Sequence, residues 1–181
     1  MIPIVLIGGR KQNGLARMMS GALAGYGKVA LCTPEAVAVD DTGGADFLLD
    51  MVLRPAAVHA KGGVMVIAEL PGRYSVPDLS DGIITVMDAE HKKAIRLLGG
   101  MANTAVCCGM SGRDTLTLSS LREDGAMVCL QRDLTSLTGE VIEPCDIPVK
   151  TAARYSERHI LFTAAVLLAC GCIPGEEGYS F

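Results

Sequence analysis

Short apolar runs alternate with helically spaced segments along the first two thirds of the chain. Residues 2–7 form a continuous apolar run that ends at a pair of glycines, which is typical of a strand buried on both faces of a parallel sheet. Residues 15–24 carry apolar side chains at helical spacing, and residues 28–33 form a second apolar run. The succession of strand, loop, helix and strand predicts a βαβ unit.

The same alternation continues as far as Cys108. We expect a helix, two strands, a second helix and a strand over residues 45–60 (interrupted near Pro55), 64–68, 82–86, 90–98 and 104–108, respectively. Strands that alternate with helices in this way predict an α/β fold, in which a mostly parallel sheet is flanked by helices.

The pattern changes after Cys108, where polar and apolar residues begin to alternate. This alternation predicts an antiparallel extension of the sheet, followed by a helix near the C-terminus. The strands are expected over residues 114–120, 126–130 and 140–149, and the helix over residues 156–169. Because no linker is visible, we expect a single domain over residues 1–181, with an α/β part (1–110), antiparallel strands (111–150) and a C-terminal helix and tail (151–181).

The composition argues against several classes of protein. Half of the 181 residues are hydrophobic and 20% are charged, a balance that excludes a disordered chain. The net charge of −4 argues against binding to nucleic acids, which requires a basic face. Seven cysteines without a Cys-x-x-Cys pair indicate reduced thiols and a cytoplasmic location. The apolar run 160–173 is too short to cross a bilayer, so no membrane partner is expected.

The loop between the first strand and the first helix is a candidate anion site. Backbone N–H groups at the N-terminus of a helix bind phosphate in this position in many α/β proteins. The loop lacks the G-x-x-x-x-G-K-[ST] pattern of a P-loop, so an ordinary glycine-rich turn remains the alternative. The candidate anion-binding residues are Gly8, Gly9, Arg10, Lys11, Gln12, Asn13 and Gly14.

Residues 4–33 contain Gly8 after the first strand, then Ala16-Arg17-Met18, Gly25-Tyr26-Gly27 and Lys28-Val29. This order resembles the opening of the central domain of the ATP-dependent Mur ligases. In the resemblance, the family's loop glycine, essential lysine and Mg²⁺-binding hydroxyl fall on the residues Lys11, Gln12 and Asn13. The resemblance therefore implies a degenerate P-loop, and binding of ATP is expected to be weak or absent.

Two later segments resemble a branch of this family that contains cyanophycin synthetase and poly-γ-glutamate synthase. The segments are Asp41-Thr42-Gly43 and Met51-Val52-Leu53-Arg54. In that branch an acidic residue after the next strand helps to bind a metal ion, and the matching residue is Glu69. The family's T-N-x-x-x-D-H motif lines up with residues 85–91, which keep an acid and a histidine at Glu90 and His91 but lack the asparagine.

The C-terminal helix supplies the last point of resemblance. Residues 155–165 are similar to the family's G-x-H-N-x-x-N-x-x-A-A helix and keep its histidine at His159. The resemblance implies a Mg²⁺ site at Glu69, Glu90 and His91, with Glu69 and His91 as the catalytic candidates. Since these three residues follow predicted parallel strands, we expect them to converge at one edge of the sheet. The alternative for each is a surface position in a loop or a first helical turn.

Two functions remain open from the sequence. The first is a domain that has lost ATP-dependent ligase activity and acts as a binding or assembly protein, with a separate ligase or a second copy as its partner. The second is an active enzyme related to the Mur ligases, whose ligand site is rebuilt around Glu69, Glu90, His91 and His159. The substituted P-loop favours the first function, and the retained acid and histidine residues favour the second.

Overall fold

The apolar run at the start of the chain forms the central strand β1 (Ile2–Ile7). Its neighbours are β4 (Phe47–Val52) on one side and β6 (Gly63–Ile67) on the other, and both pairings are parallel. The computed structural model describes residues 1–39, 43–55, 57–70, 78–152 and 155–181.

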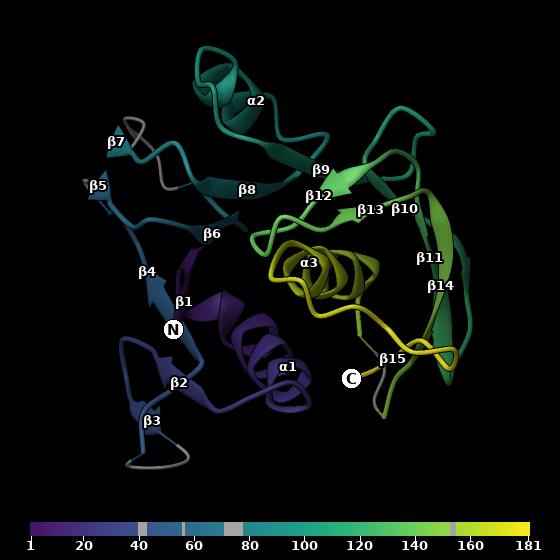
Figure 1. The fold of residues 1–181 in the computed structure, drawn as a ribbon, viewed down its shortest axis with the longest axis horizontal. Helices are drawn as coiled ribbons and strands as arrows, with labels where there is room; N and C mark the ends of the chain where they lie inside the picture. Colours follow the sequence, from purple (N-terminus) through teal and green to yellow (C-terminus); the bar gives the residue numbers. More distant parts are fainter. Residues whose placement is uncertain (40–42, 56, 71–77, 153–154) are drawn as a thin grey trace.

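One sheet of eleven strands runs through the described part of the chain (Figure 1). The strands β10, β9, β8, β6, β1, β4 and β2 are consecutive neighbours in this sheet and run parallel to one another. The strands β3, β11 and β14 each run antiparallel to a neighbour. In spatial order the sheet comprises β15 (Tyr179–Ser180), β14 (Cys145–Lys150), β11 (Gly125–Leu130), β10 (Leu116–Leu121), β9 (Ala105–Gly109), β8 (Ile83–Asp88), β6, β1, β4, β2 (Val29–Cys32) and β3 (Val37–Val39).

Two short pairs of strands lie outside this sheet. They are β5 (Ala57–Val58) with β7 (Asp78–Leu79), and β12 (Leu134–Thr135) with β13 (Val141–Ile142). The helical segments are a 3₁₀ turn η1 (Arg10–Gln12), α1 (Asn13–Ala24), α2 (Lys92–Leu98) and α3 (Glu157–Ala169). No helix among the described residues is long and apolar enough to span a membrane.

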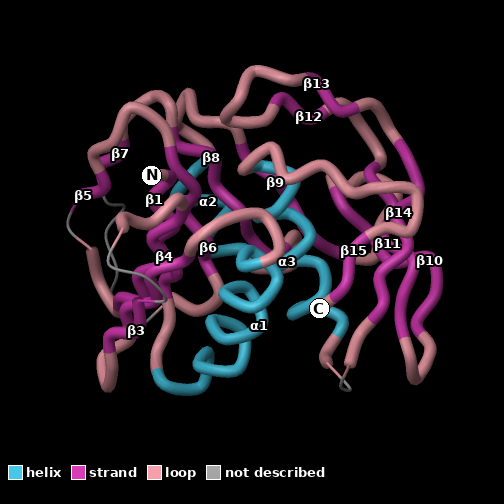
Figure 2. Tube along the Cα trace, turned by 60° about the horizontal axis from the view of Figure 1, so that its bottom comes forward, coloured by secondary structure: helices cyan, strands magenta, loops and turns pink. Residues whose placement is uncertain are grey.

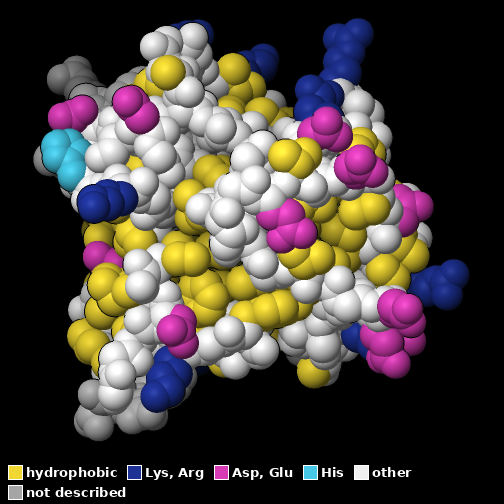
Figure 3. Space-filling view, viewed as in Figure 1, with side chains coloured by type: hydrophobic (Ala, Val, Ile, Leu, Met, Phe, Trp, Pro, Cys, Tyr) yellow, Lys and Arg dark blue, Asp and Glu magenta, His cyan; other side chains and the backbone are white. Residues whose placement is uncertain are grey.

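The sheet curves around two of the helices. Figures 1 and 2 show α1 and α3 side by side within the curve, whereas α2 lies on the opposite face. The larger core cluster joins α1 and α3 to the inner face of the sheet, and a second cluster lies under α2. On the side of the molecule seen in Figure 3, hydrophobic side chains extend across the middle, and charged side chains lie mainly toward the border.

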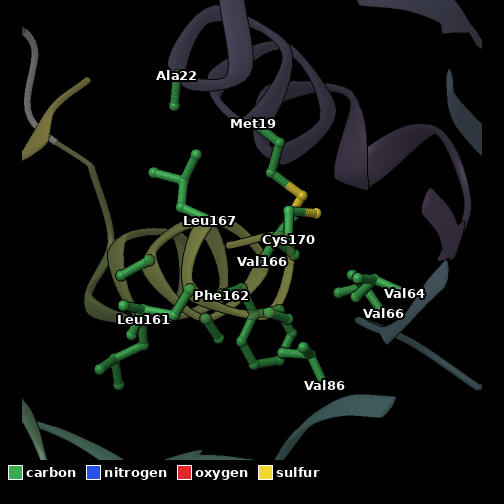
Figure 4. Packing of buried hydrophobic residues seen from close by; sticks show 14 of the residues in the cluster. Met19, Ala22, Val64, Val66, Val86, Leu161, Phe162, Val166, Leu167 and Cys170 are labelled. Carbon is green, nitrogen blue, oxygen red and sulfur yellow. The ribbon is translucent and has the colours of Figure 1, made fainter. Parts of the chain in front are cut away.

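Helix α3 is the central element of the core. Its N-terminus is capped by Ser156, whose hydroxyl accepts a hydrogen bond from the backbone N–H of His159 at 3.3 Å. Every residue from Ile160 to Ala169 is buried, so the helix is apolar on all sides. The helix ends at Ala169, and Gly171, two residues beyond, adopts a positive φ of 78° that side-chain-bearing residues rarely adopt. The close-up in Figure 4 shows Phe162 of α3 beside Val86 of β8.

The predicted α/β class is confirmed, including the antiparallel extension after Cys108. Strand β10 pairs antiparallel with β11, and β11 pairs antiparallel with β14. The predicted C-terminal helix over residues 156–169 corresponds to α3.

The prediction of a helix over residues 45–60 is wrong. Residues 47–52 form the strand β4, which lies between β1 and β2. In β4 the buried side chains of Phe47, Leu49 and Met51 alternate with half-buried ones, which is the period of a strand. The apolar residues of this short segment fit both periods, and its pairing with two parallel neighbours decides for the strand.

Candidate functional site

The candidate residues lie where the parallel strands end. The loops after β1, β6, β8 and β9 lead from the carboxyl ends of neighbouring strands in the sheet. This edge is where open α/β sheets bind their ligands. The first turn of α3 reaches the same edge, because Arg158 contacts residues at the ends of β6 and β8.

A cleft of about 310 Å³ lies beside the loop that follows β1. Its lining combines backbone and side chains of the loop with a residue after β4 and a residue after β6. The lining residues are Gly8, Gly9, Arg10, Lys11, Leu53 and Glu69. The predicted anion loop and the predicted metal ligand Glu69 therefore lie at the same cleft.

Within this loop, the side chain of Gln12 packs back against the end of β1. A Cβ atom placed on Gly8 would lie 2.5 Å from Cγ of Gln12, so any larger residue at position 8 would displace the Gln12 side chain. Arg10 extends away from the protein and forms an ion pair with Glu35, at 2.7 Å between Nε and Oε1. The amide oxygen of Asn13 is buried and has no hydrogen-bond partner among the described residues.

A second, smaller cleft of about 150 Å³ lies between the first turn of α3 and the ends of β8 and β9. It has a charged rim and an apolar wall. The lining residues are Asp88, Glu90, Cys108, Gly109, Met110, Glu157, Arg158, Leu161 and Phe162. Burial raises the pKa of the Cys108 thiol well above its ordinary value, which keeps this group protonated at neutral pH and argues against a thiolate nucleophile.

Arg158 connects the two sides of this edge. Its guanidinium donates a hydrogen bond to the carbonyl oxygen of Ala68, at the end of β6. Its Nε lies 3.6 Å from a carboxylate oxygen of Asp88, the last residue of β8. The guanidinium carbon also lies 5.1 Å from the centre of the Phe162 ring. Arg158 therefore positions the first turn of α3 against both strand ends.

The sequence did not single out Arg158 or Asp88. Arg158 immediately precedes His159, which the sequence did select, and Asp88 lies within the 85–91 segment that resembles the family motif. Arg158 and Ala68 are 90 residues apart in the chain, so only the folded topology reveals their contact.

His159 lies against the first turn of α1. A Cβ atom placed on Gly14 would lie 3.7 Å from Cε1 of this histidine. Burial, and secondly the positive charge of Arg158, lower the pKa of His159 below its ordinary value. The ring is therefore largely neutral at neutral pH.

His91 has a structural role at the start of α2. Its Nδ1 accepts a hydrogen bond from the backbone N–H of Ala94 at 3.1 Å, as the N-cap of the helix. Because Nδ1 is the acceptor, the proton of the neutral ring lies on Nε2, so His91 has no lone pair left for a metal ion while it caps the helix.

The three predicted metal ligands belong to different surroundings. Glu69 lines the cleft at the β1 loop, Glu90 lines the cleft at Arg158, and His91 caps α2. Across the ranges that the structure describes, no three His, Cys, Asp or Glu side chains are grouped closely enough to hold a metal ion. The described residues therefore do not bring Glu69, Glu90 and His91 together around one metal ion. Of the segment 41–43, residues 41 and 42 lie outside the described ranges.

The capping role of His91 predicts a specific pattern of stability. Replacing His91 by alanine should lower the free energy of unfolding by about 1 kcal/mol, because the N–H of Ala94 loses its side-chain acceptor. Urea denaturation measures the loss. His91→Asn, which keeps an acceptor at the cap, should lose less. Equal losses for both variants would contradict the capping role.

No protein-family model and no curated protein matches this sequence. Several solved structures resemble the fold over nearly the whole chain. MurF from Acinetobacter baumannii aligns with a TM-score of 0.60 at 9% identity, over 94% of this chain and 43% of that protein. The murein peptide ligase Mpl from Psychrobacter arcticus aligns with a TM-score of 0.55 at 8% identity, over 98% of this chain and 47% of that protein.

The fold is Mur-ligase-like. MurF from Thermotoga maritima, solved in complex with ADP, also aligns with a TM-score of 0.53 at 9% identity. The alignment covers 94% of this chain but only 46% of that MurF. This chain therefore spans less than half the length of each of these ligases. At identities this low the Mur-ligase-like fold is shared, while the sites are argued from this chain's own residues.

Proposed function

We propose that this Mur-ligase-like domain has lost ATP-dependent ligase activity and acts as a binding or assembly protein. The conformation of Gln12 carries the proposal. At the position that the resemblance assigns to the essential lysine, the chain has an uncharged side chain that packs against Gly8. Phosphoryl transfer depends on positive charge beside the transferred group, and removing such a contact typically costs several kcal/mol of transition-state stabilisation.

The charges around the loop support the same proposal. Arg10 is engaged with Glu35, and Glu69 adds a negative charge to the cleft that a triphosphate would enter. Asn13 offers a neutral amide oxygen where the family has a metal-binding hydroxyl. Glu69 and Asn13 carry oxygens that Mg²⁺ accepts. A triphosphate is instead disfavoured because Gln12 and the ion-paired Arg10 no longer supply positive charge.

A small anion is the ligand that the loop still suits. Lys11 lines the cleft, and α1 has no acidic residue in its first turn. The N–H groups at the start of a helix attract a single phosphate or sulfate. We therefore propose that the cleft at the β1 loop holds a compact anionic group of a ligand or partner.

Thermal melting with two probes tests the proposed function. Inorganic phosphate at a hundred times its dissociation constant should stabilise the protein by about 2.7 kcal/mol, whereas Mg-ATP at equal concentration should add no more than phosphate does. Lys11→Met should reduce the phosphate effect, and Arg17→Met serves as the control on an exposed part of α1. A larger effect of Mg-ATP than of phosphate would overturn the proposal.

The cleft at Arg158 favours a second candidate, an enzyme with a rebuilt ligand site. Its carboxylates at Glu90 and Glu157 are exposed beside the half-buried Arg158 and an apolar wall. An amide-forming activity that requires ATP and is abolished by Glu90→Gln would favour this candidate over the binding protein.

A further inference from the structure

Among the described strands, the sheet ends at β3, which has a neighbour on one side only and is distant in the strand order from the Arg158 cleft. Strand β3 occupies the outer position of the eleven-stranded sheet, beside β2 (Figure 1). Its side chains Val37 and Val39 are 71% and 56% exposed. Exposed edge strands with apolar side chains and without lysine or proline readily pair with another chain.

The hydrogen-bond pattern shows which backbone groups this edge presents. Thr33 and Ala36 exchange backbone hydrogen bonds at the turn between β2 and β3, at 2.8 and 3.3 Å. Antiparallel pairs alternate between bonded and non-bonded, so the pairs Cys32–Val37 and Ala30–Val39 are non-bonded pairs. The N–H and C=O groups of Val37 and Val39 therefore point away from β2, toward the outer edge.

The same two residues also present their side chains on an open face. Directly paired residues share a face of the sheet, so Val37 and Val39 lie on the face of Cys32 and Ala30. Their neighbour Leu31 lies on the opposite face and packs with the core cluster that contains α1. The outward backbone groups and the exposed apolar side chains thus belong to the same residues.

The charge of the surrounding segment favours a basic occupant. Between Lys28 and Arg54 the chain has five acidic residues and no lysine or arginine, and two of the five, Asp40 and Asp41, lie outside the described residues. Glu35 is neutralised by Arg10, and Asp46 accepts a hydrogen bond from the backbone N–H of Lys28. Asp50 lies on β4 in register with Cys32, on the same face as Val37. Two copies of this acidic edge repel each other, whereas a basic segment is attracted.

We propose that β3 is the docking site for an extended, basic segment of a partner protein, which adds a strand to the sheet. The partner bonds to the backbone groups of Val37 and Val39, places alternate apolar side chains against theirs, and carries lysine or arginine at its flanks. This site gives the proposed assembly role a partner and rests on that proposal.

Selection from a displayed library of random ten-residue peptides tests the site. The selected peptides should alternate apolar residues and carry a net positive charge. Their affinity, measured by fluorescence anisotropy, should fall at least tenfold for Val37→Pro, which removes an outward N–H without touching the bonds to β2. Val37→Thr, which keeps that N–H and the β-branched shape, is the matched control and should lose less.

A second variant and a mass measurement complete the test. Val37→Lys with Val39→Lys leaves the backbone intact and should also repel the basic peptides, so a folding defect of the proline variant does not decide the outcome. Selected peptides that bind both variants as well as the parent, or that lack basic residues, would overturn the proposal. A dimer that Val37→Pro converts to a monomer would assign the edge to a second copy. If the protein binds Mg-ATP and also binds the selected peptides normally, the proposed loss of ligase activity is refuted, while the docking site on β3 is retained.

Discussion

Replacing Phe162 by alanine is expected to lower the free energy of unfolding by about 3–5 kcal/mol, the usual cost of deleting a fully buried aromatic side chain. Phe162 is 0% exposed and lies on the central helix α3, beside Val86 of the sheet (Figure 4). Its ring also supports the guanidinium of Arg158. Equilibrium denaturation in urea measures the loss.

Two further variants give this prediction a scale. Phe162→Leu keeps most of the buried volume and should lose clearly less than the alanine variant. Leu121→Ala, at a side chain that is 47% exposed, should change the free energy of unfolding by about 0.5 kcal/mol or less. A loss below about 1 kcal/mol for Phe162→Ala would contradict the central position of α3 in the core.

Replacing Arg158 by methionine should cost about 1.5 kcal/mol of stability, the lower end of the range for hydrogen bonds to charged groups. The lower end applies because 40% of the Arg158 side chain is exposed to solvent. The variant leaves the carbonyl of Ala68 and the carboxylate of Asp88 without their cation. Arg158→Lys keeps the charge but not the geometry of the guanidinium, and should recover only part of the loss.

The variant Arg158→Met should also change the pKa of His159. Removing the charge of Arg158 should raise the pKa of His159, because burial then remains as the cause of the lowered pKa. In the parent protein, the unfolded chain binds more protons than the folded one just below pH 6.5, so this histidine's stabilising contribution is lost as the pH falls through that range. NMR titration of the His159 ring checks the direction of the change. A lower pKa in Arg158→Met would contradict this account.

The sequence predicts those elements whose conformation follows from the pattern of their own residues. The run 2–7 forms a parallel strand in the middle of the sheet, and the segment after Cys108 forms partly exposed antiparallel strands, so both were predicted correctly. Residues 47–52 fit a helical pattern as well as a strand pattern. Their strand conformation follows from pairing with β1 and β2, and the segment's own residues do not reveal this pairing. The edge strand β3 was not predicted, because three exposed residues carry little periodic signal.

Some features of the candidate site could be predicted from the sequence, and others depend on the fold. The glycine loop and Glu69 were each recognised from the sequence, and the structure places them at one cleft. The grouping of Glu69, Glu90 and His91 depended on the directions in which three loops leave the sheet, and the turn that starts α2 directs His91 to the helix cap. The contacts of Arg158 with Ala68 and Asp88 arise from the docking of α3, which the spacing of residues does not encode.

Calorimetric titration of the protein with Mg-ATP tests the central claim most directly. The claim is that the β1 loop, with Gln12 folded against Gly8, no longer holds a nucleotide triphosphate. We expect no saturable heat at millimolar Mg-ATP, in the parent and equally in a Gln12→Ala variant. A micromolar dissociation constant for Mg-ATP would contradict the claim.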